Sequence, residues 1–193
     1  MMNSKWTFAM TGLALVVLTA QPAAAGKRSF FIDPYSVRAT NGTSRDLGTA
    51  GTGGLVLPDN GGGFADFGFG FTIPKPYKLD SSIRIIFTWS TQDTTCGIVL
   101  EPEFVERGRA GHVVTTGTPS GGLTPENATT VLTAPAVASE GGTKVYLLNP
   151  DQGFTQQSDD AILLAFLRND SSVNDTCTSD LVITGIKIEY LTP

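Results

Sequence analysis

The alternation of aromatic and small residues between positions 66 and 73 is the most regular pattern in the chain. Phe67, Phe69, Phe71 and Ile73 occupy every second position, and Asp, Gly, Gly and Thr fill the positions between them. Side chains of a strand point alternately to its two faces, so this period of two predicts a half-buried strand. The glycines opposite the aromatic face predict that another surface approaches the backbone closely there.

A second run repeats this alternation a few residues later. Ile83, Ile85, Phe87 and Trp89 share one face, which predicts a second strand and places Trp89 in the core. Two prolines in the connection between the runs rule out one continuous strand.

Eight more short apolar runs, separated by Gly, Pro, Asn and Asp, are typical of an all-β chain. They are Ser29–Val37, Gly97–Glu101, Phe104–Arg107, His112–Thr116, Thr129–Leu132, Lys144–Leu148, Ala161–Arg168 and Leu181–Tyr190. Residues 161–167 are apolar on both faces, which predicts a central strand covered on two sides. Gly185 indicates a bulge in the last strand.

Strands of this number and length predict an all-β fold, a single β-sandwich. We expect it to be jelly-roll-like, because the connections are too long for a simple up-and-down meander. Two stretches rich in glycine or proline, Thr40–Gly63 and Thr115–Ala128, are predicted to be long loops.

The first 25 residues are typical of an export signal. Lys5 precedes an apolar stretch that ends near Leu18, and Pro22 is followed by small residues up to Ala25, the layout that a signal peptidase recognises. An uncleaved membrane anchor is the alternative, but the apolar stretch is shorter than the roughly 20 residues of a spanning helix. We therefore predict a signal peptide over 1–25 and a β-sandwich domain over 26–193. The mature chain would not insert into a membrane, and the periplasm, the cell surface and the medium all fit as its destination.

Cys96 and Cys177 are the two cysteines of the chain. In an oxidising compartment the default expectation is one disulfide between them. Such a bond would close a loop of about 80 residues, which is worth roughly 4 kcal/mol on the chain-entropy model. A metal site from both cysteines and His112 is the alternative, but their spacing matches no zinc pattern.

The charge balance is acidic and narrows the range of partners. The chain has 13 basic and 18 acidic residues, and loss of Lys5 with the signal brings the formal net charge from −5 to −6. The remaining basic residues are scattered. Nucleic acid and anionic bilayers are therefore disfavoured, because both require Lys and Arg to neutralise phosphates.

Candidate catalytic groups are few. His112 is the only histidine, so any Ser-His-Asp or Cys-His arrangement would have to use it, and the sequence has no Gly-x-Ser-x-Gly motif. Glu101 and Glu103 resemble a glycosidase pair, because residues two apart in a strand share a face about 7 Å apart. Pro102 between them interrupts the ladder, so we favour a solvated strand end and predict no enzyme.

The most polar segment, residues 168–180, lies between two apolar strands. Its carboxylates Asp170, Asp175 and Asp180 are oxygen ligands of the kind that Ca²⁺ prefers, so a structural calcium site is one interpretation. The alternative is a hairpin loop in which Asn and Asp cap the turns. We expect no other cofactor.

A sugar-binding surface would need one or two flat rings held outside the core. The residues that could supply such rings are Tyr35, Tyr77, Phe104, Tyr146 and Phe154.

Several segments together resemble a loose group of uncharacterised bacterial and phage-associated jelly-roll proteins. They are Gly61–Tyr77, the strand with Trp89, Leu163–Arg168 and Asp180–Tyr190. The resemblance covers most of the mature chain and rests on strand and turn signatures. It implies structural or surface-interaction modules and no catalytic residues.

These observations support three hypotheses. The first is a secreted, non-catalytic β-sandwich that acts as a structural or surface-interaction protein, by self-assembly into a homo-oligomer or by contact with a surface glycan or protein. The second is a carbohydrate-binding module, with or without structural calcium. The third is a glycoside hydrolase that uses Glu101 and Glu103.

Overall fold

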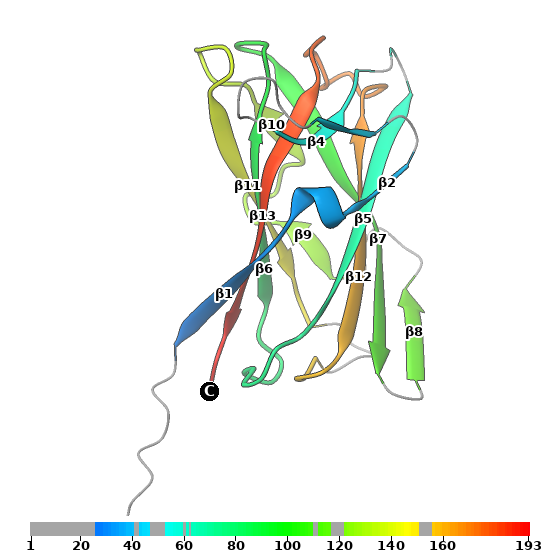
Figure 1. The fold of residues 1–193 in the computed structure, drawn as a ribbon, viewed down its shortest axis with the longest axis vertical. Coiled ribbons are helices and arrows are strands. Elements are labelled where there is room, and N and C mark those ends of the chain that lie inside the picture. Colours follow the sequence, from blue (N-terminus) through cyan, green and yellow to red (C-terminus); the bar gives the residue numbers. More distant parts are fainter. Residues whose placement is uncertain are drawn as a thin grey trace, which may run out of the picture.

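Two antiparallel sheets make up the part of the chain that the computed structural model describes (Figure 1). The described residues are 26–40, 43–46, 53–59, 61, 63–109, 112–116, 122–150 and 156–193. Among them the one helical element is the 3-10 turn η1 (Pro34–Ser36), and no helix is long and apolar enough to cross a bilayer. The predicted signal peptide lies outside the described residues and stays a prediction.

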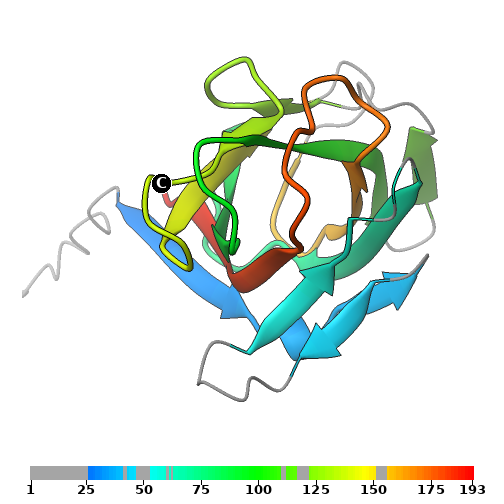
Figure 2. The ribbon, with the colours of Figure 1, turned by 90° about the horizontal axis from the view of Figure 1, so that it is seen from above.

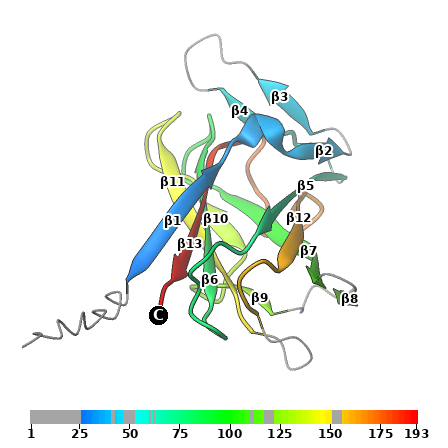
Figure 3. The same cartoon turned by 60° about the horizontal axis from the view of Figure 1, so that its bottom comes forward.

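The first sheet, sheet A, has strand β13 (Leu181–Leu191) near its centre. Its order is β3 (Ser44–Asp46), β4 (Gly54–Leu57), β13, β6 (Ile83–Ser90), β11 (Gly141–Leu148) and β9 (Leu123–Pro125), and β1 (Lys27–Ile32) also pairs with β13. β4 pairs with the first residues of β13 and β1 with the last ones. β3 and β4 therefore lie at the end of the sandwich away from the C-terminus (Figure 3).

The second sheet, sheet B, forms the opposite layer. Its order is β10 (Val131–Thr133), β7 (Gly97–Arg109), β12 (Ala161–Asn169), β5 (Phe64–Thr72) and β2 (Arg38–Thr40), and β8 (His112–Thr116) also pairs with β7. Consecutive long strands alternate between the sheets, because β5, β7 and β12 belong to sheet B while β6, β11 and β13 belong to sheet A. Such crossings are typical of a jelly roll, so the predicted jelly-roll-like β-sandwich is confirmed.

The strands of the two sheets curve around a central space (Figure 2). A cluster of aromatic rings fills this space. Phe67 and Phe69 of β5 and Phe166 of β12 meet Phe87 of β6 and Tyr146 of β11. The ring centroids of Phe87 and Phe166 are 4.8 Å apart at an interplanar angle of 82°, an edge-to-face geometry that stabilises beyond the area it buries. The alternation in the sequence therefore assigned the inward face of β5 and β6 correctly.

Several strand predictions need correction. The two runs on either side of Pro102 form one strand, β7. The register of this strand against β12 shifts between Ala165 and Phe166, so Glu103 is the extra residue of a bulge. A bulge allows a strand to continue past a residue that breaks the ladder. The predicted strand Ser29–Val37 instead ends at Ile32, and the Asp33 carboxylate accepts a hydrogen bond from the Tyr35 amide to start η1.

The two predicted loops contain strands of three or four residues. β3 and β4 lie within Thr40–Gly63, and β9 lies within Thr115–Ala128. β12 is central in sheet B, as predicted, but only one of its faces is covered, because Leu163 on the other face is exposed. The predicted bulge near Gly185 is confirmed by a register shift between Ile183 and Gly185.

The disulfide predicted from the two cysteines is confirmed. Cys96 and Cys177 are bonded, with Cα atoms 5.2 Å apart and a sequence separation of 81. The bond joins the residue before β7 to the segment that leads into β13. It therefore ties sheet B to sheet A across a long loop, where loop-closure entropy gives such a cross-link its largest effect.

Candidate functional site

A row of four residues crosses the outer face of sheet B. Arg38 of β2 is in register with Gly68 of β5, Gly68 with Ala165 of β12, and Ala165 with Phe104 of β7. Three inter-strand spacings separate the ends of this row, or roughly 14 Å between backbones. The two central residues have little or no side chain, so a guanidinium and an aromatic ring stand on either side of a low floor.

This row forms a groove of about 210 Å³. The residues that line it are Arg38, Asp66, Phe67, Gly68, Glu103, Phe104 and Ala165. A Cβ atom at Gly68 would lie 3.2 Å from the carbonyl oxygen of Leu164, a tight contact, so glycine both permits this backbone approach and keeps the floor open. We call this hollow the sheet B groove.

Two carboxylates flank the floor of the sheet B groove. Asp66 is buried on β5, and Glu103 is the extra residue of the β7 bulge, a position that re-aims a side chain. Glu103 is exposed to solvent, but partial desolvation raises the pKa of its carboxyl, and the negative charge of Asp66 raises it further. The carboxylate that raises the pKa of Glu103 is thus Asp66, which lies two strands away across β12, rather than Glu101. Glu101 instead accepts a hydrogen bond from the Asn169 side chain at 3.2 Å.

Only some of the aromatic residues that were predicted to stack on sugars lie at the surface. Phe104 lines the sheet B groove, and Tyr35 is partly exposed in η1. Tyr77 and Tyr146 are wrong as surface residues because both are buried in the core. The Tyr77 hydroxyl donates to the Gln156 side chain at 3.0 Å, and the Tyr146 hydroxyl donates to the carbonyl of Leu100.

Two other candidate residues lie beyond what the structure describes. Phe154 is outside the described residues, and so is the side chain of His112, whose backbone belongs to β8. Arg38, Asp66, Gly68 and Ala165 were missed as site residues. The alternation in β5 did place Asp66 and Gly68 on the outward face, but pairing with β2 could not be read from the sequence.

The acidic loop that was interpreted as a calcium site is held together by its own hydrogen bonds. Among the described residues, the carboxylates of Asp170, Asp175 and Asp180 do not converge on one point within metal-ligand distance. Both oxygens of Asp175 are engaged, because Arg168 donates to Oδ1 at 3.0 Å and to Oδ2 at 3.2 Å, and the Val99 amide donates to Oδ2 at 3.0 Å. Asp180 is exposed to solvent. The segment is a capped loop, which was the alternative interpretation.

Arg168 organises this loop from inside the sandwich. Its side chain is fully buried, and its five N–H groups have five acceptors. Beyond the two oxygens of Asp175, Arg168 donates to the carbonyls of Leu57 at 3.3 Å, Ser179 at 3.0 Å and Cys177 at 2.9 Å. One guanidinium therefore joins β12, β4 and the loop that enters β13.

A different trio of ligand-type atoms, from Asp93, Cys96 and Cys177, does converge within the described residues. Both sulfurs belong to the disulfide, and metal binding requires thiolates. Asp93 accepts hydrogen bonds from the amide of Ser179 at 2.7 Å and from that of Thr178 at 2.6 Å. These bonds, led by the one from Ser179, lower the pKa of Asp93. The trio is a loop anchor.

Comparisons with known proteins show only distant likenesses. No family model and no curated protein matches the sequence. A family 35 carbohydrate binding module from Clostridium thermocellum is similar over 83% of this chain and 97% of its own, with 9% identity and a TM-score of 0.47. The enzymatically active domain of bacteriophage CBA120 tailspike protein 4 is similar over 87% of this chain and 19% of its own, with 14% identity and a TM-score of 0.31. Neither likeness carries a residue or an activity over to this chain, so the fold rests on the strand pairing described above.

We predict that Asp175→Asn lowers the free energy of unfolding by about 3–5 kcal/mol, because it leaves the buried charge of Arg168 without its counterion. Asp180→Asn, in the same loop but exposed, should change it by less than about 0.5 kcal/mol. Urea unfolding followed by fluorescence measures both. Equal effects of the two substitutions would contradict the assignment of Asp175.

The raised pKa of Glu103 predicts a pH-dependent stability gain in Glu103→Gln. Partial desolvation and Asp66 disfavour the charged carboxylate in the folded state, so the wild type loses stability as the pH rises through the folded pKa. The loss is small because Glu103 is exposed to solvent. Below the unfolded value of roughly 4.3 this loss is absent. The variant should therefore melt at a higher temperature than wild type near neutral pH and at the same temperature in acid. In an Asp66→Asn background the gain should shrink, and an equal gain at every pH would refute the explanation.

Proposed function

We propose that this protein is a secreted, non-catalytic carbohydrate-binding module whose glycan lies in the sheet B groove. The observation that carries the proposal is the row in which the ring of Phe104 and the guanidinium of Arg38 face one another across a floor of Gly68 and Ala165. A pyranose presents an apolar face to an aromatic ring, and its hydroxyls both donate and accept hydrogen bonds.

The polar groups of the groove include both donors and acceptors for the hydroxyls of a sugar. Arg38 can only donate hydrogen bonds, whereas the side-chain oxygens of Asp66 and Glu103 accept them. A ring lying on the glycine and alanine floor would reach all three groups and the ring of Phe104. Pockets that bind small molecules combine an apolar surface with a few well-placed polar groups in the same way.

The size of the groove favours binding over catalysis. Its volume of about 210 Å³ is below the roughly 300 Å³ at which ordinary ligand clefts begin. A groove this small holds one sugar ring against the sheet and has no room for the two rings on either side of a glycosidic bond. We therefore assign Asp66 and Glu103 as hydrogen-bond acceptors rather than as a catalytic acid and nucleophile.

An extracytoplasmic destination accords with this proposal. The predicted export signal and the Cys96–Cys177 disulfide both suit an oxidising compartment, where polysaccharides of cell surfaces are accessible.

Phe104→Ala should weaken glycan binding by about tenfold, the loss expected for one stacking contact. A glycan array identifies the oligosaccharide that wild type binds, and calorimetry with that oligosaccharide measures the loss. Phe64→Ala is the matched control, because Phe64 is also an exposed ring on sheet B but does not line the groove. Wild-type affinity in Phe104→Ala, or no binding on the array, would refute the proposed site.

Self-assembly, the other function predicted from the sequence, has one supporting observation. β1 pairs with β13 along one edge, its second edge has no partner among the described strands, and Phe31 on β1 is 74% exposed. Open edges with apolar side chains favour pairing with another chain. If assembly uses this edge, light scattering after size exclusion should give more than one subunit for wild type and one for Phe31→Asp. A wild type that is monomeric at high concentration would contradict assembly.

A further inference from the structure

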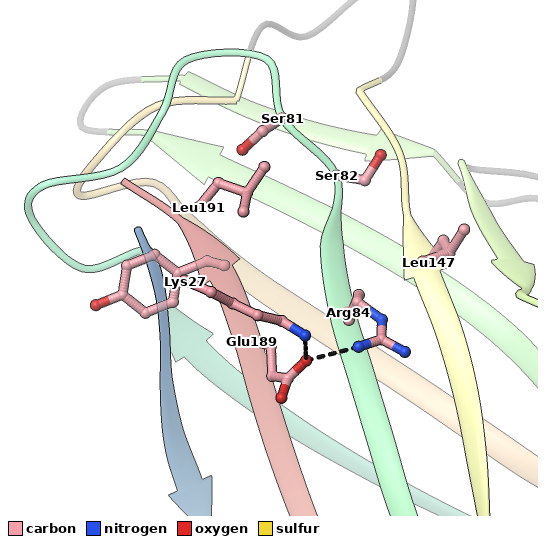
Figure 4. A pocket seen from close by; sticks show the side chains of 8 residues that line it. Lys27, Ser81, Ser82, Arg84, Leu147, Glu189 and Leu191 are labelled. Carbon is pink, nitrogen blue, oxygen red and sulfur yellow. Dashed lines mark hydrogen bonds and ion pairs between the residues drawn. The ribbon is translucent and has the colours of Figure 1, made fainter. Parts of the chain in front are cut away.

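Among the described residues, Lys144 of β11 is the one buried lysine, with 4% of its surface exposed. It shares its strand face with the buried ring of Tyr146. Lys27 and Arg84, on the outer face of sheet A, both contact the carboxylate of Glu189 (Figure 4). Lys144, in contrast, forms no ion pair with a described carboxylate. Burial lowers its pKa, which raises the share of the neutral, nucleophilic amine.

The Nζ atom of Lys144 contacts the segment that crosses from β9 of sheet A to β10 of sheet B. It donates to Asn127 Oδ1 at 2.9 Å and to the carbonyl of Thr129. A C=O bond is about 1.2 Å long, so the amide carbon of Asn127 lies within about 4.1 Å of this nitrogen. The two atoms are therefore close to the separation of about 3–3.5 Å at which reacting groups are poised.

A tight turn holds Asn127 against Lys144. The Ala128 amide closes the turn by donating, at 3.1 Å, to the carbonyl three residues earlier. The Glu126 amide donates to the carbonyl of Val145 at 2.9 Å, which fastens the turn to the residue after Lys144. The backbone therefore holds the amine and the amide together, and such fixed pairs react as if at effective concentrations of up to about 10⁵–10⁸ M.

A hollow of about 180 Å³ lies beside these two side chains. Asn127 and Lys144 line it together with Glu126, Thr143 and Val145. The carboxylate of Glu126 can take a proton from an attacking amine and pass it to a leaving nitrogen, the usual part of a general acid and base. One hollow thus contains a nucleophile, a carbonyl carbon and a proton carrier.

We propose that Lys144 and Asn127 join in an intramolecular amide bond. The neutral amine of Lys144 attacks the side-chain amide carbon of Asn127. Glu126 accepts a proton from the attacking nitrogen and returns it to the leaving nitrogen, which departs as ammonia. One C–N bond forms while another breaks, without oxidation or reduction. The product replaces a buried amine with a neutral amide and fastens the crossing segment to β11, on the opposite edge of sheet A from β1.

Mass spectrometry of the folded wild type tests the proposal. Trypsin cleaves after Lys and Arg, so an unmodified chain gives a peptide over 110–144. Acylated Lys144 resists trypsin, so the cross-linked chain should give a peptide over 110–168 that is lighter than its sequence mass by one molecule of ammonia. A folded wild type that gives peptide 110–144 at its full mass would overturn the proposal.

Lys144→Met and Asn127→Ala should each retain the full sequence mass. Lys187→Met is the matched control, because Lys187 lies on the same sheet but pairs with Glu189 at 2.7 Å, and it should form the cross-link like wild type. Cyclisation of Asn127 onto the backbone would also release ammonia, but it needs no lysine. Loss of ammonia in Lys144→Met would therefore contradict the cross-link.

Glu126→Gln tests the proton transfer separately. A glutamine keeps the shape of the side chain but cannot carry the proton, so the cross-link should form about 100-fold more slowly than in wild type. The measurement is the cross-linked fraction of freshly made protein, sampled over time. An unchanged rate would overturn the part assigned to Glu126.

Discussion

The packing of five aromatic rings between the sheets is the constraint on which the rest of this structure depends. Phe87 of β6 and Phe166 of β12 meet at 4.8 Å, and Tyr146 approaches Phe166 at 5.0 Å. Because side chains alternate along a strand, fixing Phe67 and Phe69 inside also fixes which residues face out. A slip of one residue would exchange the two faces of β5.

The same alternation that packs these rings inward decides which residues line the hollows on the outer faces of the two sheets. On sheet B the outward positions hold glycine and alanine, so a groove forms between Arg38 and Phe104. On sheet A they hold Arg84, Glu189 and leucines, so a charged and partly apolar pocket forms instead. The two layers share one core but offer different chemistry. One has a hydrogen-bonding surface with an aromatic ring, and the other has paired charges beside leucines.

Features that depend on local periodicity could be predicted from the sequence. Features that depend on contacts between residues far apart in the chain could not. The alternation in β5 and β6 identified the core, and export implied the disulfide. β4 was missed because four residues among glycines carry too little pattern, although Leu55 and Leu57 are fully buried. Asp175 was interpreted as a calcium ligand because its partner, Arg168, cannot be inferred without the fold. Tyr146 was ambiguous because the strand around it is apolar on both faces, and Arg38 joined the groove only through β2–β5 pairing.

The central claim is that a glycan lies across the row from Arg38 to Phe104. Its most direct test is a solution NMR titration of the isotope-labelled protein with the oligosaccharide that it binds. The account predicts that the largest amide shifts cluster at Gly68, Phe104 and Ala165, three neighbours on adjacent strands. Shifts confined to sheet A, or scattered without a centre on sheet B, would contradict it.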